Sequence, residues 1–316
     1  MAPLSLIVRT ATTFAPDGSL DEEAFAQYLQ RFVDTGLDVY VASGGSGEGC
    51  ALTVDELRRV YRIGVSVCQG KVLIGSNQPD QHTPAASIEH AALAVEAGVD
   101  EVQIYGPASW HGYQATGEEY TAYFDVVLKS VSHPVALCPN PTVQNTSPQV
   151  IAALCDRYHQ VKTVNLTGIH NDVYLGTLVD ALQRDDVKIN VDWSNSLSTV
   201  PQGAGGVHAA EANFTPRTFR RYLDLSDAGD TSPDIGKVYA DLRRVTQFTA
   251  RWKSSSPRLH KMVMKVFRLP GADGGVREPQ LMPDDAEVGR FTRGALALNV
   301  PEINEMAAAA GLEVPA

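Results

Sequence analysis

The chain has 316 residues, of which 44% are hydrophobic and 20% are charged. That length and composition suffice for a full-sized core, as one large domain or two small ones, and they exclude a disordered or fibrous chain. The formal net charge is −11 and the chain has no Lys- or Arg-rich block, which argues against a nucleic-acid-binding surface because neutralising phosphates requires clustered basic residues.

No membrane span, disulfide framework or metal site is indicated by the sequence. No stretch approaches the roughly 20 apolar residues that span a bilayer, and the first residues do not combine a charged segment with an unbroken apolar core. We therefore expect a cytoplasmic protein. The four cysteines have neither CxxC nor Cys/His ligand spacing, so we expect free thiols and no metal or organic cofactor. They are Cys50, Cys68, Cys138 and Cys155.

Short β-branched runs alternate with amphipathic stretches, a pattern typical of a parallel sheet covered by helices. Strands are expected at Leu6–Thr12, Asp38–Ser43, Val72–Ser76, Glu101–Tyr105, Val135–Cys138, Val161–Leu166, Lys188–Trp193 and Gly206–Ala210. Helices are expected at Leu20–Gly36, Thr53–Cys68, Thr83–Ala97, Gly117–Val131, Pro148–Tyr158, Asp172–Gln183, Ser196–Gln202 and Pro216–Ser226. Strands that alternate with helices in this way predict a closed (β/α)8 TIM barrel.

The second helix is predicted to begin after Thr53, which has capping-box spacing to Glu56 three residues later. After about residue 235 the strand patterns stop, and helices are expected at Val238–Trp252, Leu259–Phe267 and Ala286–Leu298. We therefore expect a barrel over residues 1–235 and a C-terminal helical extension, residues 236–316, that packs on it.

The ends of the strands and the loops after them form the active-site face of such a barrel. After the second strand, the run Ser43-Gly44-Gly45-Ser46-Gly47-Glu48 can turn backbone N–H groups toward a small anion, with the Ser46 hydroxyl as a further donor. Gly45 and Ser46 are therefore candidate substrate-binding residues for a carboxylate or a phosphate. The alternative is a tight turn between strand and helix that binds nothing.

Four ring side chains follow the fourth strand within residues Tyr105–Tyr113. Tyr105 and His111 are candidates for proton transfer in an apolar pocket that this segment would line. Because Tyr and Trp are also favoured in protein interfaces, the segment fits a contact between subunits equally well.

Strands five, six and eight add further polar candidates. Cys138 ends strand five, and the alternation along strand six places Thr163 and Asn165 on one face and Lys162 on the other. His208 lies near the end of strand eight, where a catalytic imidazole would lie, although a hydrogen-bonded core histidine is the alternative.

The order of these motifs resembles that of the dihydrodipicolinate synthase and N-acetylneuraminate lyase family over nearly the whole chain. The matching segments are Thr12-Thr13-Phe14 with Asp17-Gly18 and Asp21, Gly44-Gly45-Ser46-Gly47-Glu48 with Leu52-Thr53 and Glu56, Gly205-Gly206-Val207 with Ala212-Asn213 and Pro216, and Val276-Arg277-Glu278-Pro279. The resemblance implies a (β/α)8 barrel with a C-terminal helical extension and a homotetramer or homodimer. It also implies binding of a 2-oxo acid, usually pyruvate, as a Schiff base on a lysine of strand six.

This chain departs from the family pattern at the two residues that carry that chemistry. The place of the strand-six lysine falls on Asn165, and the place of the tyrosine that ends strand five falls on Cys138. An amide nitrogen is delocalised and not nucleophilic, so Asn165 cannot form an iminium with a carbonyl. Lys162 has the opposite parity and would reach the barrel interior only if the register slipped.

Three functions remain open. The first is a lyase, isomerase or cyclase that acts on a small oxo acid or related carbonyl compound by noncovalent acid–base and oxyanion stabilisation. The second is a noncatalytic protein that binds a small molecule or serves as a structural partner. The third is a conventional Schiff-base pyruvate aldolase that uses Lys162. The catalytic candidates are Asn165, Cys138, His208, Tyr105 and His111, and the substrate-binding candidates are Gly45, Ser46 and Thr163.

Overall fold

The computed structural model of the protein describes residues 3–77, 79, 81–109, 111–139, 146–167, 172–229 and 231–313. Within these ranges eight parallel strands form a closed barrel, in which each strand pairs with the next and the last pairs with the first. The strands are β1 (Ser5–Arg9), β2 (Asp38–Val41), β3 (Ile74–Ser76), β4 (Glu101–Tyr105), β5 (Val135–Cys138), β6 (Val161–Leu166), β7 (Lys188–Asp192) and β8 (Gly206–His208). The predicted (β/α)8 barrel is confirmed.

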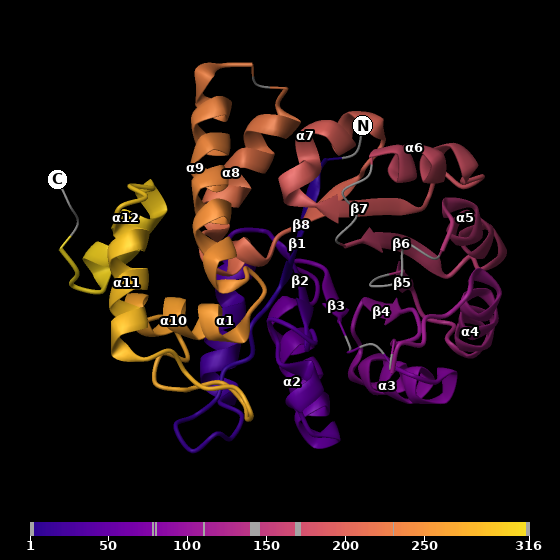
Figure 1. The fold of residues 1–316 in the computed structure, drawn as a ribbon, viewed down its shortest axis with the longest axis horizontal. Coiled ribbons are helices and arrows are strands. Elements are labelled where there is room, and N and C mark those ends of the chain that lie inside the picture. Colours follow the sequence, from indigo (N-terminus) through magenta and orange to yellow (C-terminus); the bar gives the residue numbers. More distant parts are fainter. Residues whose placement is uncertain are drawn as a thin grey trace.

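Helices cover the outside of the barrel, and a helical extension follows it in the chain (Figure 1). The barrel helices are α1 (Glu22–Asp34), α2 (Val54–Cys68), α3 (Pro84–Ala97), α4 (Gly117–Ser130), α5 (Pro148–Arg157), α6 (Asp172–Ala181), α7 (Ser196–Thr199) and α8 (Pro216–Asp227). The extension contains α9 (Pro233–Thr249), α10 (Pro257–Phe267), α11 (Asp285–Leu296) and α12 (Pro301–Ala309). In Figure 1 it lies on the side of α1 and α8, away from α3 to α6. None of the helices in the described ranges has the length and apolar character needed to cross a membrane.

Four strands, β1, β2, β7 and β8, end one to three residues earlier than the sequence predicts, at the edge of the barrel where the candidate residues lie. β2 ends at Val41 because Ala42 adopts a positive φ of 62°, which breaks the extended backbone. β1 ends at Arg9, and beyond it the backbone N–H of Ala11 donates to the side-chain oxygen of Asn213 (3.1 Å). The chain therefore turns into loops directly after the inward-facing residues of these strands.

The extension has a helix that the sequence analysis did not anticipate, α12. Its alanine-rich sequence has little apolar contrast along one face, so its periodicity is weak. One carboxylate oxygen of Glu302 accepts the backbone N–H of Arg217 (3.1 Å), and the other accepts the N–H (2.8 Å) and the hydroxyl (2.7 Å) of Thr218. Glu302 thus satisfies the first turn of α8, where Thr215 supplies no side-chain cap.

Replacing Glu302 with Ala is expected to lower the free energy of unfolding by about 2 kcal/mol, because two backbone donors of α8 would lose their acceptor. Urea denaturation measures this loss. Glu305→Ala is the matched control, since this exposed carboxylate pairs with the side chain of Arg217 and accepts no backbone N–H within the described ranges. Its loss should cost less than about 0.5 kcal/mol. Equal effects of the two variants would contradict a capping role for Glu302.

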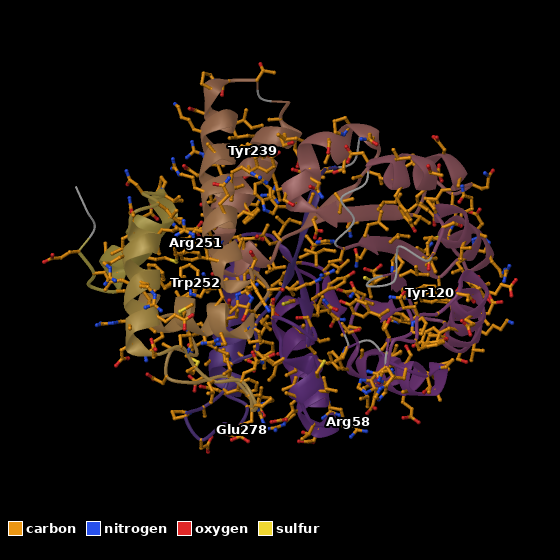
Figure 2. All side chains as sticks on the ribbon, viewed as in Figure 1. Arg58, Tyr120, Tyr239, Arg251, Trp252 and Glu278 are labelled. Carbon is orange, nitrogen blue, oxygen red and sulfur yellow. The ribbon has the colours of Figure 1, made fainter. Side chains whose placement is uncertain are left out.

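The helices of the extension enclose a small apolar core of their own, beside the larger core around the barrel. Trp252, labelled in Figure 2, packs its ring against those of Phe248 (4.9 Å between centroids) and Phe291 (5.4 Å). Phe214, from the segment just after β8, joins the same cluster. Burial of these aromatic rings therefore holds the extension against the end of the barrel.

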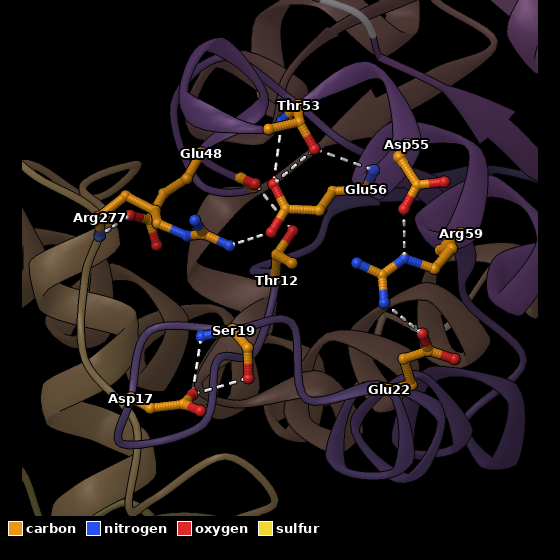
Figure 3. Close-up of polar contacts among 11 residues, drawn as sticks. Thr12, Asp17, Ser19, Glu22, Glu48, Thr53, Asp55, Glu56, Arg59 and Arg277 are labelled. Carbon is orange, nitrogen blue, oxygen red and sulfur yellow. Dashed lines mark hydrogen bonds and ion pairs between the residues drawn. The ribbon is translucent and has the colours of Figure 1, made fainter.

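A buried ionic cluster connects the extension to the loop after β2 (Figure 3). The backbone N–H of Arg277 donates to Glu48 (2.7 Å), and its guanidinium pairs with Glu56. Lys261 of α10 is fully buried, bonds to the carbonyl of Thr12 and lies 3.8 Å from a Glu48 oxygen. Burial lowers the pKa of Lys261 to about 8, although Glu48 opposes the shift. We call Glu48, Glu56, Lys261 and Arg277 the ionic clamp.

Candidate active site

Inward-facing side chains near the carboxyl ends of the strands form the candidate site. Ile7, Tyr40 and Ala136 meet one another inside the barrel. Because side chains alternate along a strand, Arg9 and Cys138, two positions further along β1 and β5, also face the interior. The barrel interior is therefore polar toward its carboxyl-terminal end, where catalytic groups of such barrels lie.

A row of amides crosses the barrel and contains Asn165. The Asn165 amide donates to Gln103 (2.7 Å) and accepts from Asn190 (2.9 Å). Gln103 donates to the side-chain oxygen of Asn77 (2.6 Å), which also accepts the Tyr105 hydroxyl (2.7 Å). We call Asn77, Gln103, Asn165 and Asn190 the amide row. It fixes the orientation of the buried Asn165 amide and connects this residue to Tyr105.

A second polar layer lies nearer the amino-terminal ends of the strands. Thr163 donates its hydroxyl to the Glu101 carboxyl group (2.6 Å), and Tyr40 bonds to the other oxygen of that group. Burial raises the pKa of Glu101, although the bonds from Thr163 and Tyr40 favour its charged form. The Thr163 hydroxyl is thus already bonded within this layer. Its role in substrate binding stays a prediction.

His208 is paired with a carboxylate and faces a hydroxyl. Its Nδ1 lies 3.0 Å from Asp192 Oδ1, and its Nε2 lies 3.5 Å from the Thr167 hydroxyl. A carboxylate only accepts hydrogen bonds, so we assign the proton of the neutral imidazole to Nδ1. The Nε2 lone pair is then directed toward Thr167 and can accept a proton.

Arg9 lies beside this pair. One of its terminal nitrogens donates to the Thr167 hydroxyl (2.7 Å), and the Cys138 sulfur lies 3.9 Å from the same oxygen. Arg9, Cys138 and His208 thus meet around the Thr167 hydroxyl, and Asp192 joins them through His208. These five residues come from five different strand ends, and we call them the strand-end cluster. The structure brings the predicted residues Cys138 and His208 together in this cluster.

The Gly-rich loop after β2 contacts the extension. The Ser46 hydroxyl lies 2.9 Å from Nε2 of His260. Burial lowers the pKa of His260 to about 3, with Lys261 contributing, so its imidazole is neutral and shares one hydrogen bond with the Ser46 hydroxyl. Added at Gly45, a Cβ would lie 3.2 Å from the carbonyl of Ser255. These two predicted substrate-binding residues therefore lie against the segment before α10, and their role in binding remains a prediction.

His111 and Lys162 lie on the surface of the protein. His111 is exposed in the loop after β4, so its catalytic role remains a prediction. Lys162 is half exposed, and its ammonium forms an ion pair with Asp186 (2.7 Å). Its side chain therefore points outward, as the parity of strand six predicts.

Sequence reasoning did not select Arg9, Thr167 or Asp192, although each had a detectable signal. Arg9 is a charged residue in an otherwise apolar strand, and Thr167 has the same parity as Asn165 on strand six. Asp192 and His208 are register partners of the adjacent strands β7 and β8. Strand order together with alternation could therefore have predicted this pair.

The sequence of this chain is similar to those of known proteins. The family model described as the dihydrodipicolinate synthetase family matches residues 2–287. A 4-hydroxy-tetrahydrodipicolinate synthase from Nitratiruptor is 31% identical over 238 residues, covering 72% of this chain and 77% of that protein. A protein of the same name from Methanococcus aeolicus is 26% identical over 264 residues, covering 81% and 86%.

Solved structures show the same fold at low identity. The dihydrodipicolinate synthase of Aquifex aeolicus has a TM-score of 0.82 at 19% identity, covering 95% of this chain and 99% of its own. YagE, a prophage protein from E. coli K12 solved in complex with pyruvate, has a TM-score of 0.81 at 19% identity, covering 94% and 99%.

Within the described ranges, no group of three His, Cys, Asp or Glu side chains is arranged to hold a metal ion.

Proposed function

Because this chain belongs to the dihydrodipicolinate synthetase family, we propose that it is a lyase-type enzyme acting on a small oxo acid or related carbonyl compound by noncovalent acid–base catalysis. His208 is the general base in this proposal. An oligomer, either a homodimer or a homotetramer, and a cytoplasmic location complete it.

The observation that carries the proposal is the Asp192–His208 pair at the strand ends. Asp192 orients the imidazole through Nδ1, which leaves Nε2 able to take a proton from the carbon next to a carbonyl group. The electron pair of that C–H bond then moves to the carbonyl oxygen and forms an enolate. The positive charge of Arg9, bonded to the Thr167 hydroxyl beside Nε2, favours this negative charge.

Neither Asn165, at the place of the family's Schiff-base lysine, nor the lysines of β6 and β7 offer an amine to the strand-end cluster. Asn165 offers only an amide that is bonded within the amide row. Lys162 is paired with Asp186 on the outside of the barrel. Lys188, on β7, donates to the Ser5 hydroxyl (2.9 Å) at the amino-terminal end of the strands. These placements favour proton transfer without covalent attachment over an imine mechanism.

Exchange of the methyl protons of pyruvate in D2O tests the proposal directly. We expect the protein to catalyse this exchange, which NMR detects, because enolate formation needs only the base and a carbonyl compound. Borohydride added with pyruvate should leave the intact mass unchanged, since no imine is present to be reduced. A covalent adduct at Lys162 or at any other lysine would contradict the proposal, and binding without exchange would favour a noncatalytic protein.

A further inference from the structure

Arg9 brings a positive charge into the end of the barrel without an ion-pair partner among the described residues. The Thr167 hydroxyl accepts one of its N–H groups (2.7 Å). Its Nε is buried and has no hydrogen-bond partner among the residues that the structure describes. Of the five N–H donors of its guanidinium, the one to Thr167 is the hydrogen bond found within the described part of the chain.

Such an arrangement is costly for the unliganded protein. Charged groups inside proteins are normally paired with an opposite charge, because the free-energy cost of removing them from water is not offset without one. Asp192 is close enough to act on the charge of Arg9, but its carboxylate is paired with His208 Nδ1 at 3.0 Å. The protein thus keeps a cation at its candidate site and directs the neighbouring carboxylate to the imidazole.

We propose that Arg9 binds the carboxylate of the substrate and is the anion-recognition residue of this chain. The inference rests on the proposed function and adds to it the residue that recognises the carboxylate group of the small oxo acid. A guanidinium presents two parallel N–H donors that match the two oxygens of a carboxylate. Bound in this way, the oxo acid has its carbonyl side beside the Thr167 hydroxyl and His208.

The Gly-rich loop is the competing anion site, and its donors are already partly used. The backbone N–H of Gly47 donates to the Ser43 hydroxyl (2.8 Å), and that of Glu48 donates to the Gly45 carbonyl (3.0 Å). The Ser46 hydroxyl is hydrogen-bonded to Nε2 of His260 (2.9 Å). Because part of its donors are used within the loop, the loop offers an anion fewer donors and no formal charge, whereas the partly buried Arg9 offers a guanidinium with an unbonded Nε.

The charge of the site favours a carboxylate over a phosphate. A phosphate monoester carries about two negative charges near neutral pH and three acceptor oxygens. Arg9 supplies one positive charge to the strand-end cluster, in which the Asp192 carboxylate lies as well. With a neutral His208 these two charges already sum to zero, so a bound monoanion adds one net negative charge and a dianion adds two. The monoanion is therefore the less costly ligand.

Calorimetric titration of the whole protein with pyruvate, 2-oxobutyrate and pyruvamide tests the proposal. Pyruvamide keeps the ketone but lacks the charge. We expect the wild-type protein to bind the two acids and Arg9→Met to bind them about 10- to 100-fold more weakly, with little difference in pyruvamide binding. Arg31→Met is the matched control, because Arg31 is also partly buried but donates to the Asn213 carbonyl outside the barrel (3.2 Å).

Thermal unfolding shows whether the variant is folded. Arg9→Met should be at least as stable as the wild type without ligand, because it removes an unpaired charge, and it should lose the stabilisation that pyruvate confers. Unchanged acid binding by Arg9→Met, no acid binding by the wild type at tens of millimolar, or tighter binding of inorganic phosphate would each overturn the proposal. His208→Gln separates the two hypotheses, since it should lose proton exchange but keep pyruvate binding.

Discussion

Replacing His208 with Gln is expected to reduce the rate of pyruvate proton exchange by about 10²- to 10⁴-fold, the range that a positioned general base contributes. Glutamine can still bond to neighbouring groups but has no basic nitrogen, so the loss falls on the chemical step. The exchange rate at saturating pyruvate, followed by NMR in D2O, measures the effect. Pyruvate affinity should change much less than the rate.

Two further variants make this result specific. Asp192→Asn should lower the same rate by a smaller factor, because the amide no longer holds Nδ1 of His208 in its protonated form. His133→Gln is the control. His133 lies just before β5, at the opposite end of the barrel, and its Nε2 bonds to the carbonyl of Val99 (2.6 Å). If His208→Gln exchanges protons at the wild-type rate, another group must be the base.

The alternation of strands and helices along the chain was enough to predict the barrel. β4, β5 and β6 have the predicted bounds, and the capping box at Thr53 forms as its spacing indicates. These features are local, because periodicity and capping depend on residues within a few positions of one another. The parity argument for Lys162 is of the same kind and agrees with its outward side chain.

The pairings inside the barrel could not be read from the sequence. Asn165 on β6 bonds to Gln103 on β4, which is not an adjacent strand, so strand order says nothing about this contact. The Ser46 hydroxyl meets His260 across more than half of the chain, although the loop alone suggested an anion site. Polar partners of this type depend on side-chain reach across the closed barrel and on how the extension docks.

Missing α12 has the same physical origin. A helix of mainly small and polar residues shows little periodicity, and its function in the fold depends on one carboxylate that reaches the first turn of α8. The ionic clamp is a further example. Its members Glu48, Lys261 and Arg277 are far apart in the chain, and only the tertiary structure buries them together.

Lys261 makes the stability of the protein depend on pH in the alkaline range. Its pKa is about 8 in the folded protein against 10.5 for an exposed lysine. Between these values the unfolded chain holds a proton that the folded protein has released, so the free energy of unfolding rises with pH through this window. Below about pH 8 both states are protonated, and the cost of the buried charge is fully present.

We therefore expect the stability difference between the wild type and Lys261→Met to shift in favour of the wild type by about 3 kcal/mol from pH 7.5 to pH 10.5. Urea denaturation of both proteins across this range measures the shift, and the subtraction removes the titration of groups that they share. Lys265→Met is the control, because this exposed residue of the same helix should leave the pH dependence unchanged. Parallel curves for wild type and Lys261→Met would show that Lys261 keeps an ordinary pKa, and that Glu48 compensates its charge fully within the clamp.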